Sequence, residues 1–222
     1  LNVGGTVGDD PACVKENIQR SFQAMGRAMD SQFDVWQVHG REVVCADAPR
    51  PSGQPHHKAD AILTDRPEVT LFMRFADCVP ILLADPVRRV AGVIHAGWQG
   101  TVKHVAAAAV EKMHACYGSQ PQDLIACIGP SIGPDHYEIG PEVVDQVREA
   151  YPEQAGRLLT QPDSRFHLDL WTANAVSLQS AGVEQVEVSG ICTACNPHDW
   201  YSHRGEKGRT GRFGALIALD NS

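Results

Sequence analysis

Two neighbouring apolar segments of the chain carry a cysteine and a histidine that could act together. Residues 69–84 and 89–95 are typical of strands, and the turn-forming residues 85–88 between them predict an antiparallel hairpin. In that hairpin Cys78 lies opposite His95, with Cβ atoms about 4.5–5.5 Å apart on one face of the sheet. A thiolate and an imidazole at this separation can bind one metal ion, or can serve as a nucleophile and its activating base. A bulge in the first strand would change this register.

The residues beside this pair also suggest a polar site. Asp77 stands among apolar residues in the run FADCVPILL, where a carboxylate is costly to bury unless it is paired. Two interpretations of Asp77 stay open: a functional carboxylate, or one that accepts a hydrogen bond from a loop amide. His95 is followed by AGWQGT, a strand-to-helix junction that can present backbone N–H groups to an anion.

A basic, glycine-rich segment lies near the C-terminus of an acidic chain. Between residues 204 and 212 it carries Arg204, Lys207, Arg209 and Arg212 among three glycines. Guanidinium groups match the geometry of phosphate oxygens, and glycine lets the backbone approach a ligand closely. A solvated basic loop is the alternative that composition alone leaves equally open.

A second pair of cysteines precedes this segment. Cys192 and Cys195, followed by His198 and His203, could form a small zinc knuckle. The separation of Cys195 from His198 is shorter than zinc fingers use, so we favour a reduced cysteine pair at the end of a strand.

Elements that could position these residues follow from the hydrophobic pattern. Helical spacing predicts helices at 10–29, with Asp10 as N-cap, at 102–113 after a Thr101 cap, at 141–151 and at 170–180. Short apolar runs predict strands at 35–38, 42–45, 58–64, 69–84, 89–95, 123–128, 186–192 and 213–219. No repeat, linker or change of composition divides the chain, so we predict a single domain of mixed α/β (α+β) structure over residues 1–222.

Composition excludes several classes of protein. With 27 acidic and 19 basic residues the 222-residue chain has a net charge of −8, which argues against nucleic acid as its main partner. No apolar run approaches the roughly 18–20 residues of a membrane span, and no signal peptide is visible at the start. Seven scattered cysteines, an odd number, argue against a disulfide-stapled secreted scaffold. We therefore expect a cytoplasmic protein, without membrane partners, that acts as a monomer.

Six segments, taken in order, make a specific set. They are QVHG (37–40), ADAILT (59–64), ADCVPILLADP (76–86), GVIHAGWQGT (92–101), IGPSIGPDHYEIG (128–140) and SHRGEKGRTGRFGALIAL (202–219). Over the whole chain the sequence resembles the YfiH-like family, long described as a polyphenol oxidase or multicopper laccase domain and now as purine nucleoside phosphorylase. That family normally has a further N-terminal strand segment before the LNVG motif. The chain departs from the pattern at Arg74-Phe75, where a small polar residue is commoner, and at His203, where an aromatic residue is usual.

The resemblance implies a fold and a site. The fold would be a layered sandwich of a mixed sheet with helices, related to that of a deamidating bacterial toxin. The family's metal ligands fall on His39, Cys78 and His95, a set that leaves a fourth position open as in catalytic zinc sites. Zinc is the implied metal, with copper as an alternative. Arg204 and, less strongly, Arg212 would contact the substrate anion, and Asp77 would orient the site.

The implied activity is phosphorolysis of adenosine, inosine or methylthioadenosine, with adenosine deamination as a second activity. Purine nucleoside and phosphate would be its partners. One alternative is a metal-free cysteine hydrolase with Cys78 as nucleophile and His95 as base. Another is a copper-dependent polyphenol oxidase (laccase), which we consider weaker because none of the ten histidines forms a His-x-His pair. A non-catalytic role is the third, since family members have been tied to peptidoglycan quality control.

Overall fold

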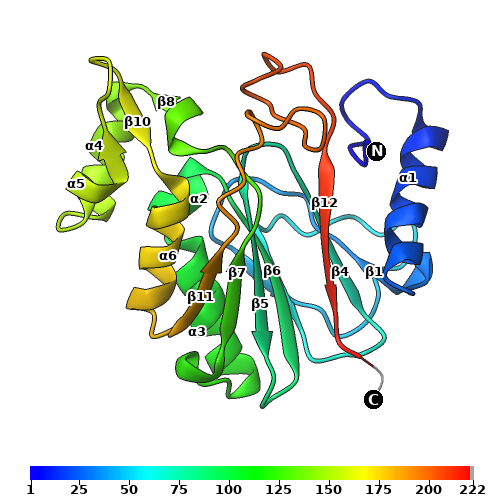
Figure 1. Ribbon diagram of the computed structural model, residues 1–222. Helices are drawn as coiled ribbons and strands as arrows, with labels where there is room; N and C mark the ends of the chain where they lie inside the picture. Colours follow the sequence, from blue (N-terminus) through cyan, green and yellow to red (C-terminus); the bar gives the residue numbers. More distant parts are fainter. Residues whose placement is uncertain (221–222) are drawn as a thin grey trace.

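The computed structural model describes residues 1–220, whose strands form two main sheets that pack face to face (Figure 1). In the larger sheet the order is β11 (Gln185–Val188), β7 (Ile125–Ile128), β5 (Val79–Asp85), β6 (Val90–Ala96), β3 (Ala61–Thr64) and β2 (Val43–Cys45). Its four central strands are antiparallel to one another, and each edge strand is parallel to its single neighbour. The smaller sheet places β4 (Thr70–Phe75) between β1 (Gln32–Phe33) and β12 (Phe213–Ala218).

Helices cover the outer faces of both sheets. α3 (Val105–Tyr117) and α6 (Leu170–Ser180) lie on the larger sheet, and α1 (Pro11–Ala24) lies on the smaller one (Figure 1). The remaining helices are α2 (Trp98–Val102), α4 (Pro141–Ala150), α5 (Ala155–Leu158) and 3-10 turns at Met29–Ser31, Pro121–Asp123 and Pro134–His136. A small third sheet joins β8 (Glu138–Ile139), β10 (Phe166–Leu168) and β9 (Leu159–Thr160). None of the helices in the described residues is long and apolar enough to cross a bilayer.

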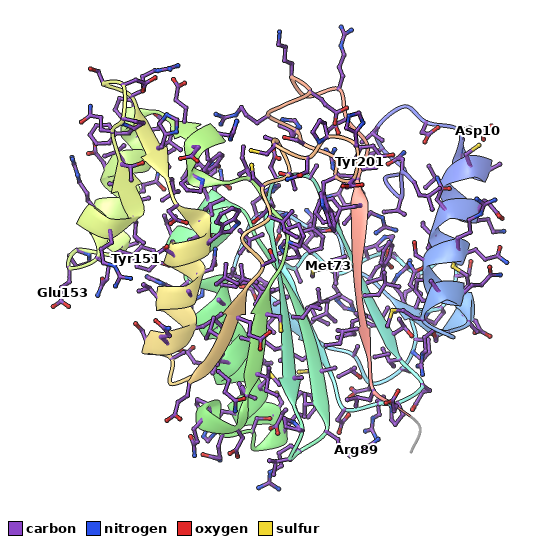
Figure 2. The ribbon with its side chains drawn as sticks, in the orientation of Figure 1. Asp10, Met73, Arg89, Tyr151, Glu153 and Tyr201 are labelled. Carbon is purple, nitrogen blue, oxygen red and sulfur yellow. The ribbon has the colours of Figure 1, made fainter. Side chains whose placement is uncertain are left out.

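Each layer boundary holds its own apolar core, because successive strand residues point to opposite faces. On β6, Val93 packs between the two sheets, whereas Ile94 packs against the helices. On β4, Met73 lies between the sheets, where Figure 2 shows it, whereas Phe72 packs against α1. Phe22 of α1 meets Phe72 edge-on, with ring centroids 5.9 Å apart. The predicted layered sandwich is confirmed, with two sheets rather than one at its centre.

Several predicted elements agree with the structure. Asp10 caps α1 by accepting a hydrogen bond from the Ala12 amide, although the helix ends at Ala24 and not at residue 29. The helix at 170–180 has the predicted bounds. Residues 35–38 form no strand; Trp36 makes one isolated bridge to Lys58. The strand predicted at 186–192 ends at Val188.

Thr101 was expected to cap a helix, and this prediction is wrong. Thr101 lies inside α2 and is buried, with its hydroxyl accepting a hydrogen bond from Asn174 Nδ2 at 3.1 Å. The helix predicted at 102–113 begins instead at Val105, after His104 turns the chain with φ at +57°. A left-handed residue cannot continue a right-handed helix, so α2 and α3 are separate.

The predicted hairpin is also corrected. The stretch 69–84 is two strands, β4 and β5, which belong to different sheets and are separated at Asp77, where φ is +75°. The strand β5 pairs with β6 so that Pro80, not Cys78, lies opposite His95. The Asp85 carboxylate accepts hydrogen bonds from two amides of the following loop, which makes Asp85 the last strand residue and moves the turn. The shift is two residues, so within β5 and β6 the side chains keep the relative faces that were predicted.

The directions of the strands place the ends that lead into the loops of the candidate residues at one end of the two sheets. The start of β5, the end of β6 and the end of β7 lie side by side, and the end of β11 is next to that of β7. The end of β4 adjoins the start of β12. The loops at these ends therefore gather at one end of the molecule (Figure 1).

Candidate metal centre and cavity

Three of the predicted site residues meet at this end of the sheets. Their potential ligand atoms, on His39, Cys78 and His95, all lie within 4.8 Å of one another. Cys78 Sγ is 3.8 Å from His39 Nε2, and the two imidazole rings cross edge-on with centroids 4.8 Å apart. His95 belongs to β6, whereas the other two come from the loops before β2 and β5.

The backbone of these loops lets the side chains of His39 and Cys78 come close to each other. His39 has φ at +58°, and the residue before Cys78 is also left-handed. Gly97 follows β6 directly, and a Cβ atom there would lie 2.9 Å from both Cys78 Sγ and His39 Cδ2. Real Cβ atoms do not approach other atoms so closely, so a side chain at Gly97 would push the cysteine and histidine apart.

Asp60 organises the group, and the sequence analysis missed it. Its fully buried carboxylate accepts hydrogen bonds from the amides of Val38 (3.2 Å), His39 (3.0 Å) and Gly40 (2.7 Å). His95 Nδ1 donates to the same carboxylate at 2.8 Å, which directs Nε2 toward the other two residues. An acid between alanines just before an apolar strand (ADAILT) was the available signal.

The ionisable side chains of Cys78, His95 and Asp60 shift one another's pKa values. Burial opposes ionisation of the Cys78 thiol, but the His95 charge and the hydrogen bond with His39 outweigh it and lower the pKa of Cys78 to about 6. Burial likewise opposes the His95 cation, yet the Cys78 thiolate and Asp60 raise its pKa to about 9. The pKa of Asp60 is lowered despite its burial, because His95 and the Gly40 amide donate to it. Without a metal ion, these shifts favour a Cys78 thiolate beside a protonated His95.

The donor spacing fits a metal ion. Tetrahedral zinc, with Zn–S near 2.3 Å and Zn–N near 2.0–2.1 Å, places a sulfur and a nitrogen ligand roughly 3.6 Å apart. Cys78 and His39 are 3.8 Å apart in the structure. Two imidazoles and one thiolate suit zinc and also copper.

A cavity of about 730 Å³ opens beside the three residues. It is lined by the six residues to which the sequence analysis assigned a role in metal or substrate binding: His39, Asp77, Cys78, His95, Arg204 and Arg212. Its volume is within the range of sites that bind small organic molecules. Trp36, Trp98 and Tyr137 add aromatic surface that the sequence analysis had not assigned.

Asp77 is tied to the C-terminal loop. Its Oδ1 accepts a hydrogen bond from the Thr193 hydroxyl at 2.7 Å, and its Oδ2 accepts one from the Arg204 amide at 2.6 Å. Of the two interpretations, the hydrogen bond to a loop amide is the one that the structure contains. The carboxylate therefore fixes the loop that carries Arg204 against the loop that carries Cys78.

Arg204 and Arg212 line the cavity without a carboxylate partner among residues 1–220. The Arg204 guanidinium lies over the Tyr137 ring, 5.2 Å from its centroid, and donates to the Glu138 carbonyl at 2.7 Å. Arg212 donates to the carbonyls of its own loop. A third lining arginine, Arg74, is paired with Asp34. Two positive charges in the cavity are thus available to an anion.

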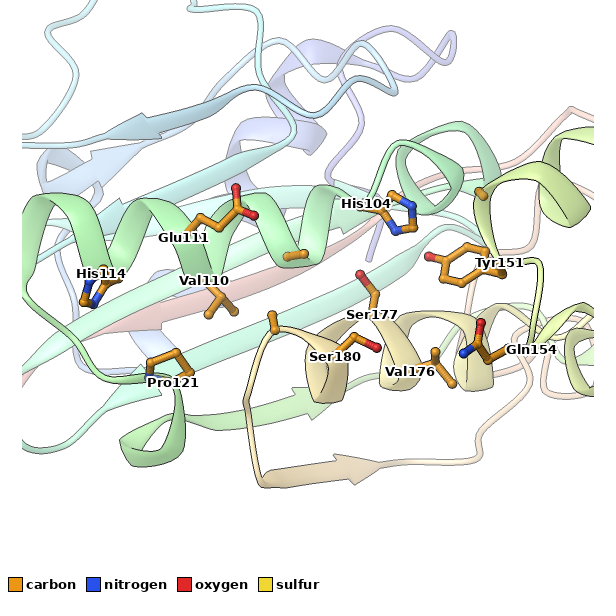
Figure 3. A pocket seen from close by; sticks show the side chains of 13 residues that line it. His104, Val110, Glu111, His114, Pro121, Tyr151, Gln154, Val176, Ser177 and Ser180 are labelled. Carbon is orange, nitrogen blue, oxygen red and sulfur yellow. The ribbon is translucent and has the colours of Figure 1, made fainter.

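A second cavity, of about 400 Å³, lies between α3 and α6 (Figure 3). His104 and Tyr151 stand close together at one end of it, with ring centroids 4.8 Å apart, and His114 lies at the other end (Figure 3). None of the six selected residues, all of which are described, lines this cavity. The residues that the sequence analysis assigned to the site therefore line the larger cavity.

The second pair of cysteines is free, as predicted, but has a different neighbour from the two histidines considered. Cys192 and Cys195 approach His136, and their ligand atoms lie within 4.8 Å of one another. The knuckle with His198 and His203 is therefore not the arrangement in the structure. His136 is far away in the sequence, so spacing along the chain gave no sign of it.

Comparisons with known proteins identify the family of the chain and agree with its fold. Residues 1–220 match the family described as "Multi-copper polyphenol oxidoreductase laccase". The chain is 41% identical over 211 residues to a protein of Deinococcus radiodurans named purine nucleoside phosphorylase, covering 95% of this chain and 79% of that protein. It is 36% identical to purine nucleoside phosphorylase YlmD of Bacillus subtilis, covering 99% and 82%.

A solved structure, that of the hypothetical protein YfiH of Bacillus licheniformis, superposes with a TM-score of 0.94 at 33% identity. The match covers 99% of this chain and 85% of that one. Sequence and fold agree over nearly the whole chain, and the chain belongs to the YfiH family.

Proposed function

We propose that the protein is a zinc-dependent purine nucleoside phosphorylase. The observation that carries the proposal is one cavity that joins a two-histidine, one-cysteine centre to two arginines without carboxylate partners. Relatives that share 41% and 36% identity over nearly the whole chain bear the name purine nucleoside phosphorylase, which supports the same activity here.

In this reaction inorganic phosphate attacks the anomeric carbon of the ribose. The glycosidic C–N bond breaks, its electron pair leaves with the purine, and the purine takes up a proton. Arg204 and Arg212 would hold the phosphate, since forked guanidinium groups bind oxyanions in a fixed orientation. Asp77 would keep Arg204 in place through the backbone hydrogen bond already described.

Aromatic side chains offer a place for the base. Trp36 lines the cavity and is 54% exposed, so its indole offers accessible aromatic surface to a planar ligand. Tyr137 lies on the same cavity under the Arg204 guanidinium. Burial raises the pKa of its hydroxyl, which keeps Tyr137 neutral near any anion. The purine would then stack on Trp36 while the phosphate stays near the arginines.

His39, Cys78 and His95 would hold the zinc ion, and Asp60 would keep His95 oriented toward it. Bound there, the metal would supply Lewis-acid chemistry, polarising a substrate group or lowering the pKa of a water molecule, as hydrolytic deamination of adenosine requires. We therefore include adenosine deamination as a second activity. We prefer zinc to copper because neither phosphorolysis nor deamination involves a change of oxidation state.

Chromatographic assays with inosine, adenosine and methylthioadenosine, with and without phosphate, test the proposal. We expect phosphate-dependent release of base and ribose 1-phosphate, loss of both with a chelator, and recovery with Zn²⁺. His95→Ala should abolish turnover, whereas His114→Ala, in the other cavity, should retain it. Base release that is independent of phosphate, or full activity in His95→Ala, would refute the proposal.

One observation favours a second candidate, a metal-free cysteine hydrolase. Asp60, His95 and Cys78 stand in the order orienting acid, base and nucleophile. Metal analysis separates the two functions: about one zinc at this centre, lost in Cys78→Ser, supports the ligand role. A laccase is less well supported, because the centre gathers one thiolate and two imidazoles where a multicopper oxidase needs many more histidines. The monomeric state and the cytoplasmic location stay predictions.

A further inference from the structure

We propose that His136, Cys192 and Cys195 form a second metal site, which takes a zinc-like divalent cation. The proposal does not depend on the phosphorylase activity, because none of these three described residues lines the large cavity. The ligand atoms of all three lie within 4.8 Å of one another.

Their spacing matches one ion. His136 Nδ1 is 3.8 Å from Cys192 Sγ and 3.6 Å from Cys195 Sγ. Tetrahedral zinc with standard bond lengths separates a nitrogen and a sulfur ligand by roughly 3.6 Å. Thiolate and imidazole are the donors that zinc prefers in proteins, and carboxylate-preferring ions such as magnesium do not suit them.

The backbone around the cysteines already holds one sulfur in place. The Gly133 amide donates to Cys192 Sγ at 3.2 Å. A Cβ atom at Gly133 would come within 3.2 Å of Cys192 Cβ, so glycine permits this approach. Asn196 closes the turn after the cysteines by donating its side-chain amide to the Cys192 carbonyl at 2.8 Å.

Backbone pairing holds the two contributing loops together before any metal binds. Ser131 and Cys192 form an isolated parallel bridge, with hydrogen bonds from Ser131 N to Ile191 O (3.1 Å) and from Thr193 N to Ser131 O (3.0 Å). His136 ends the short 3-10 turn that follows Ser131. Because His136 and Cys195 are exposed, an ion can enter from solvent, and water can fill the fourth position.

The site would steady one wall of the large cavity. Tyr137, which lines the cavity, is next to His136, and Thr193, which donates to Asp77, lies between the two cysteines. A metal ion that links the loops of His136 and Cys192 therefore holds Tyr137 and Thr193 in place, without contacting a molecule bound in the cavity. Binding is balanced by protons: each cysteine releases one as its sulfur becomes a ligand, so two protons leave for each divalent ion.

Cobalt titration of reduced, metal-free protein tests the proposal, since thiolate ligands give Co²⁺ a strong near-ultraviolet absorption. In a His39→Ala/Cys78→Ser variant, which lacks the first centre, we expect one equivalent of Co²⁺ with the absorption of two thiolates. Zn²⁺ should displace it and should raise the melting temperature of that variant.

Adding His136→Ala or Cys195→Ser, both at exposed positions, should weaken binding by more than about 100-fold, because even loss of an outer partner costs 10- to 100-fold. Cys13→Ser, an exposed cysteine on α1, is the matched control and should leave binding unchanged. The proposal is overturned if the double variant shows no thiolate absorption, or if His136→Ala and Cys195→Ser leave it unaltered. A Cys192–Cys195 disulfide that persists in reductant, detected as two thiols lost to alkylation, would overturn it equally.

Discussion

Asp60→Asn tests whether one buried carboxylate positions the first metal centre. Oδ1 of Asp60 serves the His39 amide and His95 Nδ1, and Oδ2 serves the Val38 and Gly40 amides. An asparagine keeps one acceptor oxygen and replaces the other by an NH₂ group, so two of these four donors lose their partner. Each buried unsatisfied donor costs about 1–3 kcal/mol, which predicts a loss of about 2–6 kcal/mol in the free energy of unfolding.

Metal affinity should fall independently of this loss. Removing the negative charge weakens the hydrogen bond that makes His95 a better ligand, and hydrogen bonds to charged groups contribute about 1.5–3 kcal/mol. At about 1.4 kcal/mol for each factor of ten, zinc affinity should drop by about 10- to 150-fold. This agrees with the 10- to 100-fold that outer partners of metal ligands usually contribute.

The assay combines chemical unfolding of metal-free protein with zinc competition against a chromophoric chelator. The competition is best made in a Cys195→Ser background, so that only the first centre reports. Asp85→Asn is the matched control: Asp85 is equally buried and accepts two loop amides, but at the opposite end of β5. Its zinc affinity should equal that of the parent. A folded Asp60→Asn protein that binds zinc within about threefold of the parent would refute the positioning role.

Three further results are expected. Gly97→Ala should reduce zinc affinity by at least about tenfold, because the new Cβ would lie 2.9 Å from Cys78 Sγ. This loss is comparable with that of an outer partner of a metal ligand. Zinc competition measures the affinity, and an unchanged dissociation constant would contradict the prediction. In metal-free protein the pKa of Cys78, near 6, predicts that alkylation accelerates as pH rises through 6, when the thiolate forms. His95→Gln should move that midpoint upward, and mass spectrometry of the Cys78 peptide follows it. Arg204→Ala should raise the KM for phosphate by about 10- to 150-fold, with little change for nucleoside, whereas Arg209→Ala, outside the cavity lining, should not.

Much of the fold follows from local sequence signals. Helix α6 lies where the apolar spacing predicts it, and Asp10 caps α1 as its side chain and the following proline indicate. The hairpin register could not be obtained in this way. It depends on the Asp85 carboxylate, which binds the loop amides and so decides which residue ends the strand. Hydrogen bonds from a side chain to the nearby backbone compete with strand pairing. The number of residues in the loop, from which the register was predicted, does not reveal them.

The candidate site was likewise only partly predictable from the sequence. Cys78 and His95 were selected from the predicted hairpin, whose register was wrong by two residues, and His39 from the family resemblance; the structure brings all three together. Asp60 was not selected, because its importance comes from partners 20 to 35 positions away in the chain. His136 reaches Cys195 across 59 positions, through a bridge between two loops that no periodicity reveals. Contacts between loops depend on the completed sheets.

The two proposed metal sites differ in how far the protein positions their ligands before an ion binds. At the first, left-handed backbone at His39 costs about 1–2 kcal/mol, and three amides bonded to Asp60 offset that cost without any ion. The geometry there is set by a fully buried carboxylate, as a site that must meet a substrate requires. At the second, His136 and Cys195 are exposed, and only Cys192 is buried. Its ligands depend more on the ion to order them, which suits a site that steadies loops, whereas the first suits chemistry.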